Sequence, residues 1–373
     1  MLIKFEVSNF EGFKDKLEFN LSSNKRYDFN QNFVEKKCIK KALIYGENGT
    51  GKSSLCTAIM DITYHIVEKE KNLIPIERYF YGGKVDNGAK FIYTFKFKKD
   101  IYKYEYVKSS PTSLIYEKLF INDELILEYN FFDQSHLINK IEDTATLNLI
   151  GLPPQISIIK YIYNNTLRKE DSPINKIVDY VSRMLFFRSS VEGNLYLGYS
   201  NGPESLSSII IKNKKIDEFQ DFLKTQNINY NLVEFSDQNG VSNLGVKFEN
   251  GNILPFGSIV SSGTKTLWLF YCWMLEFPNL SMLIIDEFDA FYHYSTARGI
   301  LSIINKYSNL QAIITTHNLM LMNNELTRPD CCFILSQNTI RPLCSLTEKE
   351  IRKKNNLQKM YIDKEFTNYF EKK

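Results

Sequence analysis

Hydrophobic and polar residues alternate in some stretches of the chain, while other stretches are continuously apolar. Alternation at Ile3–Phe5 and Leu17–Asn20 predicts strands with one buried face, and the unbroken run Ala42–Tyr45 is typical of a strand buried on both faces. Apolar residues then recur at helical spacing from about Gly51 to Glu68. This part of the chain therefore predicts a buried parallel strand that leads directly into a helix.

The rest of the chain changes its pattern three times. Residues 91–107 and the runs around 122–123 are rich in β-forming residues and predict an antiparallel meander, and residues 145–225 then show helical periodicity. Two Asn-Gly pairs, at 239–240 and 250–251, are hairpin signals that place strands at about 230–235, 244–248 and 253–256. Residues 260–335 read as helix, strand, helix, strand, helix, strand.

Together these patterns predict an α/β fold with a mixed central sheet, an antiparallel β subdomain and a helical lid insertion. We expect an N-terminal lobe at 1–140, the helical insertion at 141–228 and a C-terminal lobe at 229–373. No heptad pattern persists over three or four repeats, so we expect no long coiled coil.

Composition narrows the class of protein. The chain has 373 residues, 43% of them hydrophobic, which is enough to form a large core without covalent or metal cross-links. Its six cysteines show no CxxC pairing, and the longest apolar run, Leu267–Leu275, is far shorter than a membrane span. We therefore expect a cytoplasmic protein with no membrane partner.

The charge of the chain neither requires nor excludes binding to nucleic acid. The net charge is only +3, but basic clusters occur at Lys36–Lys41, Lys212–Lys215 and Arg352–Lys354. Each cluster is either a solvated face or a contact to a phosphate backbone.

The segment GENGTGKSS at Gly46–Ser54 matches G-x-x-x-x-G-K-[ST] at every fixed position, and it lies between the predicted strand and helix. Such a loop curls its backbone N–H groups around anionic oxygens at a helix N-terminus. Lys52 should reach the β and γ phosphates, and the Ser53 hydroxyl should ligate Mg²⁺. No Asn-Lys-x-Asp element for guanine occurs, so ATP is the expected nucleotide. The predicted nucleotide contacts are Asn48, Gly49, Thr50, Gly51, Lys52, Ser53 and Ser54.

Two later strands should end in polar residues beside this loop. SMLIIDEFDAF at Ser281–Phe291 predicts an apolar strand ending at Asp286, a Mg²⁺ ligand, and Glu287, a general base or water-orienting group. QAIITTHN at Gln311–Asn318 repeats the pattern and ends in His317. His317 is either a γ-phosphate sensor or a structural histidine, and we favour the sensor.

A second anion site is predicted at GSIVSSGTKTLW, Gly257–Trp268, where Ser261 and Gly263 open a helix. The interval from Gly263 to Asp286 accommodates one helix of about 13 residues, roughly 20 Å long, a turn and a strand. The serine–glycine turn should therefore lie far from the phosphate loop of its own chain. This geometry favours its use by the nucleotide of a second copy.

The order GENGTGKS, SSGTKTL, LIIDEFDAF, TTHN resembles ABC-type ATPases of the SMC, RecF and OLD group, and is most similar to compact AAA-family ATPases of bacterial phage-defence and abortive-infection systems. IKFEVSNFEGFKD is similar to the first strand and "NF" turn of that group, and the resemblance covers about residues 1–60 and 255–365. It implies an ABC-type P-loop ATPase head and a homodimer that holds two ATP molecules between its copies.

Roles for individual residues also follow from the resemblance. Ser261 and Gly263 correspond to the signature serine and glycine that contact the partner's γ-phosphate, Asp289 to an acidic residue at the dimer interface, and His317 to the switch histidine. The glutamine that normally ligates Mg²⁺ has only two candidates here, Gln134 and Gln155.

The sequence thus favours an ATPase that converts ATP and water to ADP and phosphate and acts as a dimeric switch. The resemblance implies control of a separate effector, a nuclease or toxin, in anti-phage defence. The alternative is a DNA-end-binding ATPase of repair or chromosome maintenance.

Overall fold

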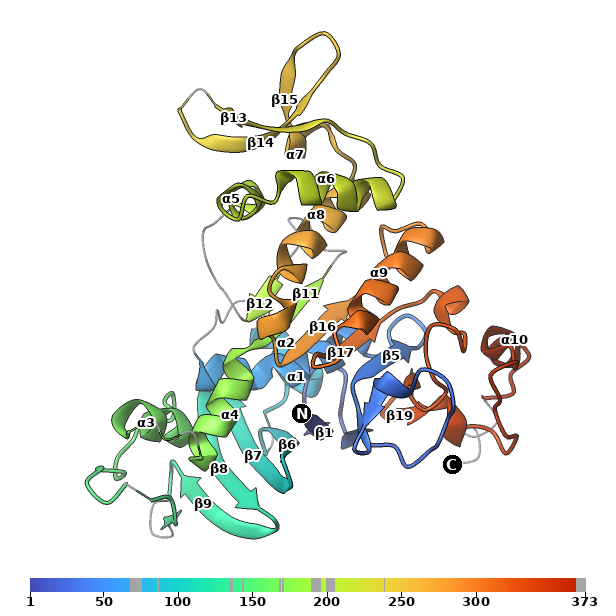
Figure 1. Cartoon of the computed structure of the whole chain (residues 1–373). Helices are drawn as coiled ribbons and strands as arrows, with labels where there is room; N and C mark the ends of the chain where they lie inside the picture. The colour runs from blue at the N-terminus through green and yellow to red at the C-terminus, as the bar shows by residue number, and fades with distance from the viewer. Residues whose placement is uncertain are drawn as a thin grey trace.

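Two seven-stranded sheets form the body of the molecule (Figure 1). The computed structural model describes residues 1–67, 76–85, 87–133, 137–142, 144–167, 169, 171–188, 196–198, 205–237 and 239–366. One sheet is mixed and lies at the centre, and the other is antiparallel. A three-stranded sheet and a two-stranded ribbon, β3 (Val34–Glu35) with β4 (Cys38–Ile39), complete the β structure of this part of the chain.

The central sheet has the order β12-β11-β16-β17-β5-β18-β19, with five parallel strands between two antiparallel edge strands. Its strands alternate between two hydrophobic cores: Ala42 and Ile44 of β5 face one, and Leu43 and Tyr45 face the other. This two-sided burial explains the continuous apolar runs. The strands are β11 (Met184–Arg188), β12 (Tyr196–Gly198), β16 (Met282–Asp286), β17 (Gln311–Thr315), β5 (Lys41–Tyr45), β18 (Cys332–Ser336) and β19 (Thr339–Pro342).

The antiparallel sheet confirms the predicted meander. Its buried face carries alternate aromatic residues such as Tyr93, Tyr104 and Tyr106, which pack toward α1 (Lys52–Ile66). The order is β10-β9-β8-β7-β6-β1-β2, formed by β1 (Leu2–Ser8), β2 (Leu17–Asn20), β6 (Ala89–Phe97), β7 (Asp100–Ser110), β8 (Ser113–Ile121), β9 (Glu124–Asn130) and β10 (Ile138–Asn139).

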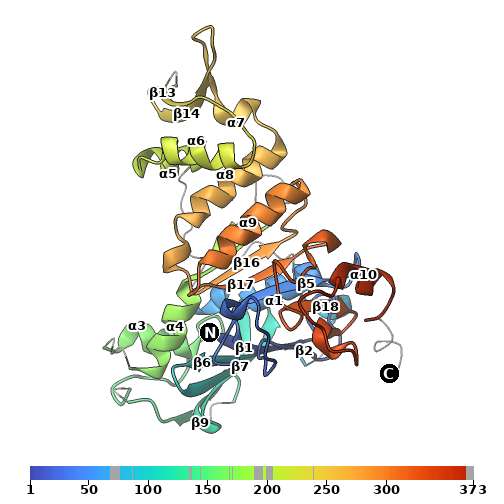
Figure 2. The ribbon, with the colours of Figure 1, turned by 45° about the vertical axis from the view of Figure 1, so that its right-hand side comes forward.

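Helices cover both faces of the central sheet. On one face, α1 lies between the two sheets, with α3 (Ile158–Asn165) and α4 (Pro173–Ser182) in the same core. On the other face, α8 (Ser262–Met274) and α9 (Tyr294–Lys306) run beside β16 and β17 (Figures 1 and 2). The remaining elements are α5 (Leu206–Lys212), α6 (Ile216–Thr225), β13 (Leu232–Ser236), β14 (Ser242–Lys247), β15 (Ile253–Pro255), α7 (Phe256–Ile259), and the short α2 (Ile76–Tyr79) and α10 (Leu357–Ile362).

One buried side chain, Gln311 at the start of β17, connects the two sheets by hydrogen bonds. Its Oε1 accepts hydrogen bonds from the Leu2 backbone N–H and the Tyr180 hydroxyl, both at 2.9 Å. Its Nε2 donates to the carbonyls of Leu2 at 2.7 Å and Ile39 at 2.9 Å. A single amide thus ties β1 of the antiparallel sheet to β17 and to Ile39 of β4, two residues before β5.

Two predictions about elements were wrong. Residues 145–225 contain α3 to α6, but also β11, a strand of the central sheet. The third helix expected within 260–335 is only a single 3₁₀ turn, η5 (Leu319–Leu321). The longest helix of the described residues, α1, has 15 residues, which is too short for a long coiled coil.

None of the helices in the described ranges combines the length and the hydrophobicity that a membrane crossing requires. The division into units at 1–140, 141–228 and 229–373 stays a prediction.

Candidate nucleotide-binding site

The phosphate loop leaves the fully buried strand β5 and enters α1 at Lys52, as predicted. Two of its glycines are required by close approach: a Cβ on Gly46 would lie 2.6 Å from the Leu335 carbonyl oxygen, and one on Gly51, whose φ is +96°, would lie 3.0 Å from the Phe13 ring. Gly51 is the N-cap of α1, so no capping side chain accepts from the first-turn N–H groups. The first-turn N–H groups of any helix point toward its N-terminal end, which is the arrangement that binds phosphate.

Lys52 lies inside the curl of the loop. Its Nζ donates to the carbonyls of Gly46 at 2.8 Å and Glu47 at 2.9 Å. Burial lowers the pKa of the Lys52 ammonium, and the nearby carboxylates of Asp286 and Glu287 oppose this effect. The loop residues Glu47, Asn48 and Gly49 are exposed.

The "NF" turn near the N-terminus packs beside the loop. Phe13 contacts Gly51, and the Thr57 hydroxyl of α1 donates to Glu11 Oε2 at 3.3 Å. The turn closes on itself through backbone hydrogen bonds between Phe10 and Phe13 at 2.8 and 3.0 Å. It therefore supports the first turns of α1 from the side of the antiparallel sheet.

Asp286 ends β16 and is fully buried. Both of its carboxylate oxygens have partners: Oδ1 accepts from the Thr315 hydroxyl at 2.7 Å, and Oδ2 accepts from Arg188 Nε at 2.7 Å. Arg188 ends β11, the parallel neighbour of β16, and its residue register pairs it directly with Asp286. The side chain of Arg188 is 22% exposed, so this ion pair reaches the surface of the site.

Glu287 and Asp289 follow in a turn that is pinned to β17. Glu287 adopts a φ of +50°, an uncommon value for a residue with a side chain, and its N–H donates to the Thr315 hydroxyl at 2.8 Å. The Thr316 hydroxyl donates to Asp289 Oδ1 at 2.6 Å. Thr315 and Thr316 therefore orient the backbone and side chains of the acidic turn.

His317 follows this threonine pair and is exposed. Partial burial and the positive charge of Lys52 lower the pKa of its imidazole, while the carboxylates of Asp289, Glu287 and Asp286 oppose that shift. These interactions place His317 within electrostatic range of the loop lysine and of all three acidic residues.

The serine–glycine turn opens α8 as predicted. Ser261 is the N-cap, and its Oγ accepts from the Thr264 N–H at 3.2 Å. A Cβ on Gly263 would lie 2.8 Å from the carbonyl oxygen of Phe291, so this turn touches the segment that follows Asp289. In Figures 1 and 2, α8 begins beside α7, away from α1. Within the described residues, the contacts of Ser261 and Gly263 do not reach Gly46–Ser54.

The structure therefore brings Lys52, Asp286, Glu287, Asp289 and His317 to one edge of the parallel sheet. Of the two candidate glutamines, Gln155 donates to Ser113 Oγ of the antiparallel sheet at 3.4 Å, and Gln134 lies outside the described residues.

Besides Thr315 of β17, Asp286 is reached by Arg188 of β11, which sequence reasoning missed. A signal was present, because Met184–Phe187 is an apolar run that ends in a charged residue, as β16 does.

Residues 41–323 of the chain match the family described as "AAA domain, putative AbiEii toxin, Type IV TA system". The chain belongs to this AAA-domain family. The match includes the phosphate loop, the serine–glycine turn and the acidic strand end, as well as the middle region where the sequence resemblance was weak. The chain is accordingly a P-loop ATPase-like domain with a nucleotide-binding fold.

Several solved structures are similar to this AAA-domain protein at low identity. The SMC head domain from Thermotoga maritima is 14% identical, with a TM-score of 0.42, and 91% of this chain and 98% of that chain are covered. A structure of SmcHead bound to the C-winged helix domain of ScpA is 12% identical, with a TM-score of 0.45 and coverage of 91% and 96%. The ATP binding subunit of an ABC transporter is 10% identical, with a TM-score of 0.40 and coverage of 96% and 98%.

With TM-scores below 0.5, these likenesses are too distant to indicate a function. No curated protein matches the sequence.

Ser53 and Asp286 carry oxygen atoms of the kind that suits a hard divalent cation. Ser53 lies in the first turn of α1, and the Asp286 carboxylate ends β16; hydroxyl and carboxylate oxygens are the ligands that Mg²⁺ prefers. Arg188 cannot serve as a metal ligand, because its guanidinium group is positively charged and has only hydrogen-bond donors.

Proposed function

We propose that this protein binds ATP with Mg²⁺ and hydrolyses it as a head-to-tail homodimer. One observation carries the proposal: Lys52, Asp286, Glu287 and His317 meet at one edge of the sheet, while the Ser261–Gly263 turn opens a helix whose start lies away from α1. In a dimer, the turn of one copy would complete the phosphate site of the other.

The roles of the residues follow from their positions. Lys52 and the N–H groups of Asn48–Ser54 would contact the phosphates, and Ser53 and Asp286 would hold Mg²⁺, which neutralises phosphate charge when bound. His317 would contact the γ-phosphate, Asp289 would lie at the interface between copies, and Ser261 and Gly263 would bind the partner's γ-phosphate.

Glu287 is the proposed general base. It accepts a proton from the attacking water as the water oxygen bonds to the γ-phosphorus, and the bond from that phosphorus to the bridging oxygen breaks to release ADP. The Thr315 hydroxyl accepts a hydrogen bond from the Glu287 N–H and so holds the backbone that carries this carboxylate.

The test uses Glu287→Gln with Mg²⁺ and ATP in sedimentation experiments. The variant should bind ATP, fail to turn it over and accumulate as dimers, because the closed state is no longer released by hydrolysis. Adding Ser261→Arg should leave single copies that still bind ATP, and Lys52→Ala should abolish ATP binding. A Glu287→Gln protein that stays single-copy at high concentration with saturating ATP contradicts the proposal.

We further propose that the closed state controls a separate nuclease or toxin in anti-phage defence. The description of the matching family, which names a type IV toxin–antitoxin system, supports a link to such systems, and the separate effector is what the sequence resemblance implies. The test compares phage plating on cells that carry the gene with its neighbours. Protection should be lost with Lys52→Ala and kept with Lys98→Ala, an exposed lysine at the β6–β7 turn. Equal protection by both variants contradicts control by the nucleotide-bound state, and no protection by the wild-type genes contradicts the defence role.

A further inference from the structure

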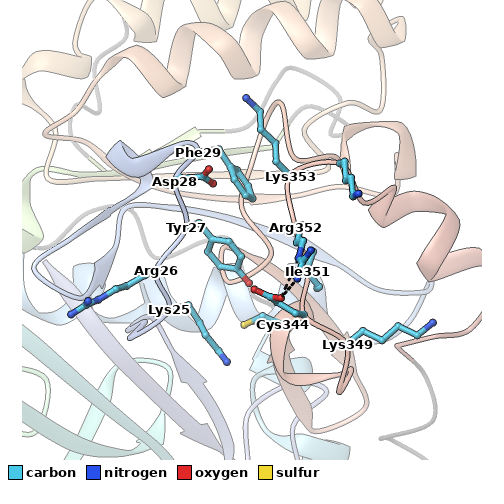
Figure 3. A pocket seen from close by; sticks show the side chains of 12 residues that line it. Lys25, Arg26, Tyr27, Asp28, Phe29, Cys344, Lys349, Ile351, Arg352 and Lys353 are labelled. Atoms are coloured by element: carbon cyan, nitrogen blue, oxygen red, sulfur yellow. Dashed lines mark hydrogen bonds and ion pairs between the residues drawn. The ribbon is translucent and has the colours of Figure 1, made fainter.

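A hollow of about 810 Å³ lies between two segments that are distant in the sequence, residues 25–29 and 344–354. Figure 3 shows Tyr27 between Lys25 and Arg26 of the first segment and Arg352 and Lys349 of the second. The lining contains only two acidic residues, Asp28 and Glu350, against six cationic ones: Lys25, Arg26, Lys349, Arg352, Lys353 and Lys354. The hollow is therefore strongly basic.

Only some of this positive charge is compensated. Lys349 pairs with Glu365 and Arg352 with Glu350, each at 2.8 Å. In the described part of the chain, the side chains of Lys25, Arg26, Lys353 and Lys354 have no ion-pair partner, and all four residues are exposed. Four uncompensated cations around one hollow attract a polyanion.

Two asparagines, the half-buried Asn30 and the buried Asn324, connect the two walls by hydrogen bonds, so the cations on the two walls are held in one arrangement. Asn30 Nδ2 donates to the Asn324 carbonyl at 3.0 Å and to the Thr327 carbonyl at 2.8 Å. Asn324, which is 3% exposed, donates through Nδ2 to the carbonyls of Arg352 at 3.0 Å, Lys353 at 3.3 Å and Asn355 at 3.2 Å. A site that is already assembled loses less entropy on binding.

The basic surface also extends beyond the first hollow. A second hollow of about 790 Å³ shares Lys25, Arg26 and Tyr27 with the first and adds Lys37. The cations thus follow a track, from the 353–354 pair past Lys25 and Arg26 to Lys37. A track fits an extended chain of phosphates better than it fits a compact anion.

We propose that this track binds the phosphate backbone of a single-stranded nucleic acid. Tyr27 favours that ligand over an acidic peptide, because its half-buried ring lines both hollows, and aromatic rings beside cations are the usual platform for unpaired bases. Arg328 supports this ring, with its guanidinium 5.2 Å from the ring centroid. The site lies outside the ATPase residues and does not depend on the proposed function.

The experiment measures the anisotropy of a fluorescein-labelled single-stranded oligonucleotide as protein is added at several salt concentrations. Lys353→Glu/Lys354→Glu should weaken binding about tenfold and lower the slope of log affinity against log salt by about 1.4, for two lost phosphate contacts. Lys98→Glu/Lys99→Glu makes the same charge change at two exposed residues of the β6–β7 turn and should leave both quantities near the wild-type values.

Further variants keep the result interpretable. Lys25→Ala/Arg26→Ala should also weaken binding, and Lys52→Ala should bind the oligonucleotide normally, which separates this site from the ATP site. Equal losses in the 353–354 and 98–99 variants, or no binding by the wild-type protein, would overturn the proposal. So would a poly-glutamate of matched charge that displaces the oligonucleotide as well as unlabelled strand does.

Discussion

Arg188 Nε lies 2.7 Å from Asp286 Oδ2, so a guanidinium from the neighbouring strand occupies one oxygen of the carboxylate proposed to hold Mg²⁺. The charge of this fully buried carboxylate is thus neutralised from within the chain. If Asp286 holds Mg²⁺ as proposed, Arg188 and the cation compete for the same oxygen, and the stability of the site then depends on whether the cation is bound.

Arg188→Ala should reveal this competition. Without nucleotide, the variant should lose about 1–3 kcal/mol in free energy of unfolding, because Asp286 keeps a buried charge without its partner, while partial exposure of Arg188 moderates the loss. Mg²⁺ with ATP should recover part of the deficit. Urea unfolding with and without Mg²⁺-ATP measures both effects. Arg183→Ala, an exposed arginine just before β11, is the matched control, and equal stability of the two variants would refute the competition.

Thr315→Val should lower kcat more than it changes the affinity for ATP. The hydroxyl binds both Asp286 Oδ1 and the Glu287 N–H, and valine keeps the shape while removing both bonds. We expect a loss of about tenfold to hundredfold in turnover from misplaced catalytic groups. Steady-state kinetics and binding of a fluorescent ATP analogue separate the two quantities. Thr225→Val, which removes a hydroxyl from the end of α6, should leave both unchanged.

Gly263→Ala should abolish ATP-driven dimers without abolishing ATP binding. The added Cβ would lie 2.8 Å from the Phe291 carbonyl, so the serine–glycine turn and the segment after Asp289 must separate. Gly257→Ala is the control, since its Cβ would meet only the Trp268 ring, at 3.4 Å. Sedimentation with ATP reports the dimers, and normal dimers from Gly263→Ala would argue against a role for this turn.

Glu117 should make stability depend on pH. Burial raises the pKa of its carboxyl to about 7 from the ordinary 4.5, although Tyr104, Ser157 and the Ile158 N–H donate to it. Between these values the folded state holds more protons than the unfolded state. Stability contributed by this group is therefore present below the ordinary value and lost as pH rises to about 7.

Glu117→Gln should remove this part of the pH dependence. Urea midpoints of variant and wild type at about pH 5 and about pH 8 give the comparison, and the difference between the two proteins should shift in the variant's favour at the higher pH. Glu249→Gln, at an exposed turn, should show a constant difference from wild type. A constant difference for Glu117→Gln as well would mean that its carboxyl titrates normally.

The strands that carry the site were predictable because parallel strands buried on both faces are continuous apolar runs, and polar residues at their ends stand out. Lys41–Tyr45, Met282–Asp286 and Gln311–Thr315 all have this form. Met184–Arg188 has it as well, but it follows directly on the helix α4, and a short apolar run does not by itself distinguish helix from strand. Missing β11 also meant missing Arg188.

Contacts between loops that are distant in the sequence were the other feature that could not be predicted. Nothing in the spacing of Asn30, Asn324 and Arg352 shows that their loops meet, because their hydrogen bonds connect residues 28 and 294 positions apart. The basic cluster at Arg352–Lys354 was visible, but its combination with Lys25 and Arg26 came only from the fold.

The hydrogen bonds of Gln311 restrict which parts of the molecule can move relative to one another. All four of its hydrogen bonds run to groups in or beside the two sheets. An ionised glutamate could not replace this amide because it has no N–H donor, and methionine could not because it has no donor and only a weak sulfur acceptor. These bonds attach β1 of the antiparallel sheet to β17 of the central sheet and to Ile39, two residues before β5. We expect any hinge that opens and closes with nucleotide to lie on the opposite side of the molecule, among α5, α6 and α8.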